Sequence, residues 1–144
     1  MRKLLAPQSM AGLFGFAFVV VGVLGFIPGA VQDYALLHWW RPGSGAQLFG
    51  LFQTSILHNL VYIGLGVAGL VTARSLTAAR AYLTVGGAVY TALAVYGLLV
   101  DRGGSANVLP ADRADDWLHL GIGVLMIYAG LAATLPASRP AASP

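Results

Sequence analysis

Two short stretches of the chain place a histidine close to the start of a long apolar run. The first covers residues 55–62 (SILHNLVY) and carries His58. The second covers residues 115–120 (DDWLHL) and carries His119. In a chain with five acidic residues and three histidines, these two imidazoles are the most chemically capable groups near the apolar segments.

The spacing around each histidine predicts a shared helix face. His58 and Tyr62 stand at positions i and i+4, and Asp116 and His119 at i and i+3, so each pair would project from one side of a helix. Imidazole is the commonest metal ligand and carboxylate a good companion, so His58, His119 and Asp116 could hold Zn or Cu. The two imidazoles could instead hold a haem iron axially inside a helix bundle.

A structural role would explain the same polar residues. A helix that begins near lipid headgroups has N–H groups without partners, and Ser55, Asp115 and Asp116 are suitable caps there. Aspartate also suits the positive end of a helix dipole. The sequence therefore leaves a cofactor site and a set of capping residues as alternatives.

The same structural interpretation covers the residues that follow each cap. His58 and Asn59 could hydrogen-bond to a partner helix, which stabilises a membrane bundle by about 0.6 kcal/mol per contact. In this interpretation Asn59, Tyr62 and Asp115 are structural polar residues. His38 lies beside two tryptophans and is expected to be an interface residue.

Composition predicts a membrane protein of one domain. The chain is 58% hydrophobic, and 9% of its residues are charged, against about 25% in soluble proteins. Its mean hydropathy is +0.76. The basic residues form no cluster, so nucleic acid is not an expected partner, and the lipid bilayer is. Cysteine is absent, which excludes disulfides, iron–sulfur clusters, thioether-linked haem and thiolate catalysis.

Four apolar runs predict an all-α, integral membrane four-helix bundle made of two tandem transmembrane hairpins. A run of roughly 18 residues is enough to cross a hydrocarbon core of about 30 Å. The first run is longer than the apolar region of a signal peptide, so we expect it to be retained. The expected spans are residues 10–30, 56–73, 79–100 and 117–135, preceded by a basic segment at 1–9 and followed by a disordered tail at 136–144.

The loop between the first two spans is expected to lie at the membrane surface. Trp39 and Trp40 are typical of an interfacial anchor, with the indole N–H among the headgroups. Residues 46–54 are apolar enough to lie along the interface or to extend the second helix outward.

The charges predict the orientation. One side collects Arg2, Lys3, Arg74, Arg80 and Arg139 without an acid, and the other collects Arg41, Arg102 and Arg113 with all five aspartates. The excess of basic residues in short loops predicts that both termini are cytoplasmic. We therefore expect a multi-pass protein of the cell (plasma) membrane.

The spans also contain a weak internal repeat. Residues 21–26 resemble residues 94–99, and Leu57-His58 resembles Leu118-His119. A repeat of this kind would relate the hairpins by an axis along the membrane normal and place both histidines at the same depth. Small residues are expected at the helix contacts: Ala11/Gly15, Gly22/Gly25/Gly29, Gly64/Ala68 and Gly121/Gly123.

Several classes of function lack their sequence signatures. The middle of each expected span carries no charge, whereas ion-coupled transporters normally need a charge there. The polar groups within the spans are hydroxyls: Thr72, Thr84, Tyr90, Thr91, Tyr96 and Tyr128. The chain has no phosphate-binding loop, dinucleotide fingerprint or nucleophile–base pair, so we do not expect an enzyme.

The chain resembles the small four-helix membrane proteins of domain-of-unknown-function family 4383. The resemblance is carried by residues 22–29 (GVLGFIPG), 57–62 (LHNLVY) and 114–119 (ADDWLH). It implies a four-span fold and no established activity. Members often carry a second histidine one turn after His-Asn and an asparagine before Trp/Phe-Leu-His, where this chain has Tyr62 and Asp116.

The first functional hypothesis is a non-catalytic accessory or self-associating helix bundle, whose partner is another membrane protein or a second copy. The alternative is a haem- or metal-binding membrane protein that uses His58 and His119 near the outer face. A further alternative is permeation of a small solute.

Overall fold

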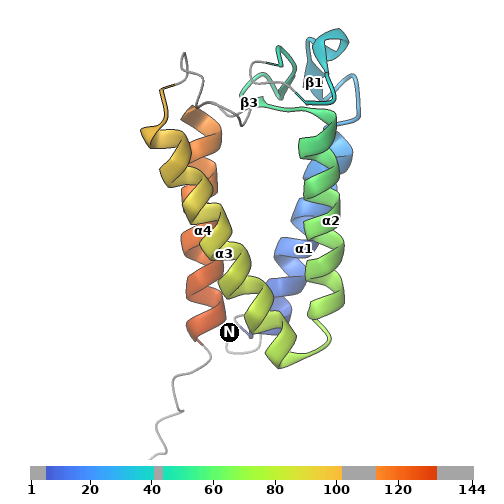
Figure 1. Ribbon diagram of the computed structural model, residues 1–144. Coiled ribbons are helices and arrows are strands. Elements are labelled where there is room, and N and C mark those ends of the chain that lie inside the picture. Colours follow the sequence, from blue (N-terminus) through green and yellow to red (C-terminus); the bar gives the residue numbers. More distant parts are fainter. Residues whose placement is uncertain (1–5, 41–43, 102–112, 133–144) are drawn as a thin grey trace, which may run out of the picture.

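The computed structural model describes residues 6–40, 44–101 and 113–132, which form four long helices and one small sheet (Figure 1). The helices are α1 (Pro7–Leu24), α2 (Ile56–Thr72), α3 (Leu76–Leu99) and α4 (Arg113–Ala132). This architecture confirms the all-α class. Of the basic segment expected at 1–9, residues 1–5 lie outside the described residues and residues 7–9 belong to α1; the tail expected at 136–144 lies outside the described residues.

The four helices pack as two hairpins. The first consists of α1 and α2 and the second of α3 and α4, and the closest packing lies within each hairpin. The hairpins converge near the short connection between α2 and α3 and diverge toward the sheet (Figure 1). The wider end therefore lies beneath the sheet, where the expected histidine site falls.

Serine hydroxyls fix the start of two helices. The Ser55 Oγ accepts a hydrogen bond from the backbone N–H of His58 at 3.2 Å, and the Ser75 Oγ accepts one from Ala78 at 3.5 Å. Both serines therefore satisfy an N–H group that has no partner within its own helix. The first helix begins with Pro7, whose missing N–H costs nothing at that position.

The loop between α1 and α2 folds into a small antiparallel sheet of strands β1 (Val31–Gln32), β2 (Gln47–Leu48) and β3 (Phe52–Gln53). The expectation that residues 46–54 could extend the second helix is wrong. The chain reverses at Phe49 and Gly50, which both have positive φ angles, and a helix cannot continue through such a pair.

The loop segment between β1 and β2 is joined to the start of α2 by backbone hydrogen bonds. The N–H groups of Ile56 and Leu57 donate to the carbonyl oxygens of His38 and Trp39, at 3.0 and 3.2 Å. A small apolar core of Val31, Ala46 and Leu48 lies beneath the strands. The described part of the loop therefore packs on the wide end of the bundle.

Glycines bring the two helices of each hairpin into backbone contact. A Cβ added at Gly15 would lie 2.7 Å from the carbonyl oxygen of Gly66. In the second hairpin, a Cβ at Gly87 would lie 2.7 Å from the carbonyl oxygen of Gly123. Both distances are shorter than any real Cβ contact, so each crossing requires glycine on both helices.

The glycine contacts show the register of the internal repeat. Gly15 and Gly66 of the first hairpin correspond to Gly87 and Gly123 of the second. This register matches Phe18 with Tyr90, Asn59 with Asp116, and Tyr62 with His119. The repeat read from the sequence pairs His58 with His119 and places both at the same depth. In the register of the glycine contacts, His58 corresponds to Asp115 instead. Because α4 begins at Arg113, one turn before the expected Trp117, His119 lies one turn further into its helix than His58.

The glycine contacts predict the effect of single methyl groups. Gly66→Ala and Gly123→Ala each place a methyl group against the backbone of the neighbouring helix, and should destabilise the fold by about 1–3 kcal/mol. Unfolding of the purified protein in one detergent, followed by circular dichroism, measures this loss.

The matched controls are Gly64→Ala and Gly121→Ala, which stand two residues earlier on the same helices. No atom lies within 4 Å of a Cβ at either position. These variants should unfold like the wild type or be more stable by up to about 1 kcal/mol. Equal stability of all four variants would contradict the close helix contacts.

Candidate functional site

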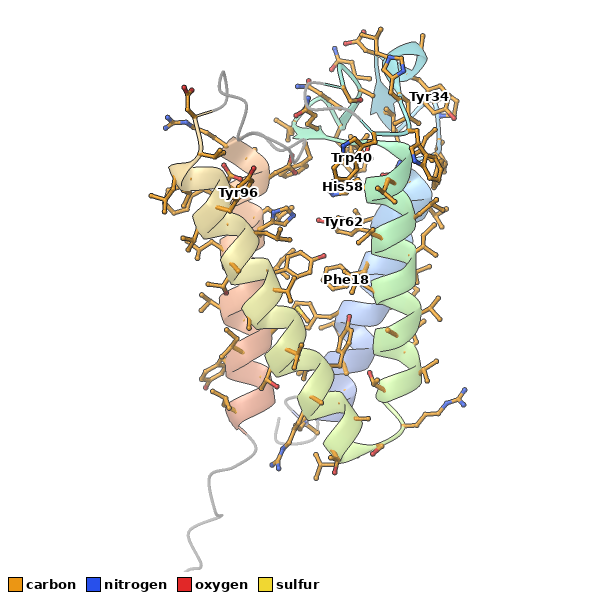
Figure 2. All side chains as sticks on the ribbon, in the orientation of Figure 1. Phe18, Tyr34, Trp40, His58, Tyr62 and Tyr96 are labelled. Atoms are coloured by element: carbon orange, nitrogen blue, oxygen red, sulfur yellow. The ribbon has the colours of Figure 1, made fainter. Side chains whose placement is uncertain are left out.

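Five rings from all four helices fill the space between the two hairpins. Phe18 and Tyr90 stack at a centroid distance of 5.3 Å, and Phe18 and Tyr62 form a T-shaped pair at 5.5 Å. His58 and His119 complete the set, which we term the ring cluster. Figure 2 shows the side chains of Phe18, His58 and Tyr62 directed toward the second hairpin. Aromatic pairs of this kind contribute about 0.5–1.5 kcal/mol beyond their buried area.

The structure brings His58 and His119 together. Their ring centroids are 6.3 Å apart, and His58 also stacks on Tyr62 at 4.8 Å. The hydroxyl oxygen of Tyr62 lies 3.5 Å from Nε2 of His119. Tyr90 and His119 form a T-shaped pair at a centroid distance of 5.2 Å. The two histidines named from the sequence are therefore neighbours at the seam between the hairpins.

Asp116 lies at the contact between α3 and α4, within the second hairpin. Its side chain is buried and packs against Gly97 of α3. Asp115 and Asp116 were expected as caps, but both stand inside the first turn of α4 and face inward. Within the described residues, no three His, Cys, Asp or Glu side chains are placed to hold one metal ion.

The Asn59 side chain links the start of α2 to the end of α1 and to the end of the sheet. Its Nδ2 donates to the carbonyl oxygen of Gly25 at 2.7 Å, just past the end of α1. Its Oδ1 accepts a hydrogen bond from the Thr54 hydroxyl at 2.5 Å, at the end of the sheet. The structural role expected of Asn59 matches this geometry, and Gly25 and Thr54 are the partners that sequence reasoning missed.

A cavity of about 220 Å³ opens beside the ring cluster, beneath the sheet. It is lined from α1, α2, α4 and the loop before α2, and the sheet supplies Leu48, Phe49, Phe52 and Gln53. Sequence reasoning missed these four residues, because nothing in an apolar loop indicates that it folds back over a helix end. The other lining residues are Val21, Thr54, His58, Asn59, Tyr62, Asp115 and Leu118.

The site lies within a domain of a known family. The model of the family described as "Domain of unknown function (DUF4383)" matches residues 8–132. The chain belongs to this family. The DUF4383 match contains the ring cluster, the cavity and the three motifs that carried the resemblance. No curated protein and no solved structure matches the chain.

Proposed function

We propose that this DUF4383 protein is an integral membrane protein that crosses the bilayer four times, with both termini in the cytoplasm. We propose further that it works without catalysis, as an accessory subunit or a self-associating bundle. The observation that carries the membrane proposal is the apolar outer surface of all four helices.

Large apolar side chains cover that outer surface. Exposed examples on each helix are Leu13 and Phe16 on α1, Val61 and Val67 on α2, Val85 and Leu99 on α3, and Leu125 and Leu131 on α4. An apolar surface of this extent is rare on soluble monomers, whereas lipid chains match it. Lipid is therefore the solvent that this surface fits.

The lengths of the helices are consistent with this proposal. Within the described residues, α1 and α3 are long and apolar enough to cross a bilayer by length and composition. Helix α2 is apolar over its 17 residues and about 25 Å long. Helix α4 has 20 residues, and its charges stand in the first two turns, where headgroups would lie.

The ends of the bundle differ in charge. Arg74 and Arg80 lie at the α2–α3 connection, while Asp33 and Asp101 lie at the opposite end with the sheet. The positive-inside rule places the arginine end in the cytoplasm. The sheet, the cavity and His58 would then lie at the outer face.

Single cysteines test the orientation, because the natural chain contains none. Asp33→Cys should react with a membrane-impermeant maleimide on intact cells, since residue 33 would lie outside. Ser75→Cys should react only after the membrane is permeabilised. Labelling of Ser75→Cys on intact cells would reverse the proposed orientation, and release of the unmodified protein by alkaline carbonate would contradict membrane insertion.

Self-association is favoured by one surface of α2. Gly64 is exposed with no atom within 4 Å of its Cβ position, and Ala68 is exposed one turn further along. The contact expected from the sequence at Gly64/Ala68 is therefore not made within the described chain. A small-xxx-small pair of this kind lets a second helix approach closely in a bilayer.

Replacement of Gly64 by a large residue tests this surface. Gly64→Leu should reduce the fraction of dimers or larger species that chemical crosslinking detects in native membranes, because leucine separates the two backbones. Gly121→Leu is the matched control, since Gly121 is equally open on α4 but has Leu125 one turn on. A wild-type protein that is monomeric and retains no partner in mild detergent would contradict the proposal.

A second candidate function is the binding of haem or a metal ion by His58 and His119. The observation in its favour is the 6.3 Å separation of the two ring centroids, from opposite hairpins. Imidazole nitrogens would supply the ligand bonds, and the Tyr62 hydroxyl would orient His119 through its Nε2.

Spectroscopy decides this second candidate. Protein purified from native membranes should show a Soret band, or about one metal ion per chain by elemental analysis, if the histidines form a cofactor site. His58→Ala and His119→Ala should each abolish the signal, and the exposed His38→Ala should leave it unchanged. A signal that survives in the double variant would eliminate these histidines as ligands.

A further inference from the structure

We propose that the cavity beneath the sheet binds an uncharged, mostly apolar molecule that carries one hydroxyl group, and that the imidazole of His58 binds this hydroxyl. This site goes beyond the proposed membrane function, because it concerns a ligand of the cavity. The proposal rests on the hydrogen bonds of the lining residues, on the apolar remainder of the wall and on the volume of the cavity.

Three polar side chains of the wall already have partners within the protein. Gln53 Nε2 donates to the carbonyl oxygen of Ser44 at 2.6 Å. Asn59 Nδ2 donates to the carbonyl oxygen of Gly25, and the Thr54 hydroxyl donates to Asn59. These hydrogen bonds form without a ligand, so they hold the wall in place.

Two further polar residues of the wall are also engaged. The Tyr62 hydroxyl lies 3.5 Å from Nε2 of His119, and Asp115 already interacts with other groups of the protein. A cationic ligand would have to share that carboxyl, and an anionic ligand would be repelled by it. Because an ion buried without a partner of its own is costly, the wall favours an uncharged ligand.

The imidazole of His58 is the exception among the polar groups of the wall. Its ring stacks on Tyr62 at 4.8 Å and lines the cavity. Among the described residues, neither of its ring nitrogens takes part in a hydrogen bond, since the bond of His58 to Ser55 uses the backbone N–H. A neutral imidazole has one donor and one acceptor nitrogen. A hydroxyl both donates and accepts, so it pairs with whichever nitrogen faces the cavity.

The rest of the wall is apolar and consists of Val21, Leu48, Phe49, Phe52 and Leu118. An apolar cavity with a few placed polar groups is the usual form of a small-molecule site. Phe49 has a φ of 53°, a left-handed conformation that is rare for a bulky residue. Backbone strain of this kind clusters at ligand sites, where it fixes a side chain in position.

The volume limits the size of the ligand. At roughly 30 Å³ per water molecule, a cavity of 220 Å³ has room for about seven waters, or for a molecule of about seven non-hydrogen atoms. A six-carbon alcohol therefore matches the cavity in charge, hydrogen bonding and size.

Calorimetry on the full chain in phosphatidylcholine nanodiscs tests the chemical class, with empty nanodiscs as the blank and affinities expressed per lipid. The probes are 1-hexanol, hexane, hexylammonium and hexanoate, which share one chain and differ at its end. Hexanol should bind measurably and more tightly than each of the other three. Failure of hexanol to bind, or equal binding of any other probe, would overturn the proposal.

Nuclear magnetic resonance of protein with ¹⁵N-labelled histidine rings locates the hydroxyl. The chain has three histidines, and the signal of His58 is the one that His58→Phe removes. Hexanol should shift this signal saturably and leave that of the exposed His38 unchanged. A His58 signal that does not move would contradict its role. The sample used is one free of haem and metal, which keeps this test separate from the cofactor candidate.

Two variants measure what the imidazole and the cavity contribute. His58→Phe keeps a ring against Tyr62 but removes both nitrogens, and should weaken hexanol binding about threefold or more, while its affinity for hexane should not fall. His38→Phe is the matched control and should bind like the wild type. Leu118→Trp should weaken both probes by filling the cavity, and its control is Leu125→Trp on the outer surface of α4. Unchanged hexanol affinity in His58→Phe or in Leu118→Trp would overturn the site, and circular dichroism verifies the fold of each variant.

A second nanodisc composition distinguishes two sources of the hydroxyl. In nanodiscs that contain dioleoylglycerol as well as phosphatidylcholine, a weaker apparent affinity for hexanol shows that the hydroxyl of a lipid competes for the cavity. An unchanged affinity assigns the site to a small alcohol. Either result retains the hydroxyl chemistry and decides where the ligand comes from.

Discussion

The backbone contact between paired glycines determines how the rest of this fold is arranged. Gly15 against Gly66, and Gly87 against Gly123, bring the helices of each hairpin closer than any side chain would allow. Such contacts gain packing energy through the backbone, which is the main source of helix association where lipid removes the hydrophobic effect. Two tight hairpins are the consequence, and their association must rest on other groups.

Those other groups are the long side chains at the seam between the hairpins. Phe18 and Tyr90 stack across the seam, and Tyr62 meets His119 there. In the register of the repeat, each of these pairs consists of equivalent residues from the two hairpins. The ring cluster therefore lies where the two halves of the repeat face each other. Beyond the rings the hairpins diverge, and the sheet covers the cavity that remains.

Much of this arrangement could be predicted from the sequence, because apolar runs and small residues have strong physical signals. The four helices, the Ser55 cap and the proximity of His58 and His119 agree with the structure. The sheet was missed because two-residue strands have no periodicity to detect. The inward direction of Asp115 was missed because α4 begins one turn earlier than its apolar run. The additional turn also changes which residues of the two hairpins are equivalent, so that His119 corresponds to Tyr62 and not to His58.

The two halves share their packing contacts and differ in the polar residues near the cavity. The glycine contacts are equivalent in both hairpins, which indicates that both need the same packing. The polar residues are different: His58 corresponds to Asp115, Asn59 to Asp116, and Tyr62 to His119. Packing alone does not require such differences at equivalent positions. His58, Asn59, Tyr62 and Asp115 line the cavity, so the differences between the two halves adjoin the cavity beneath the sheet.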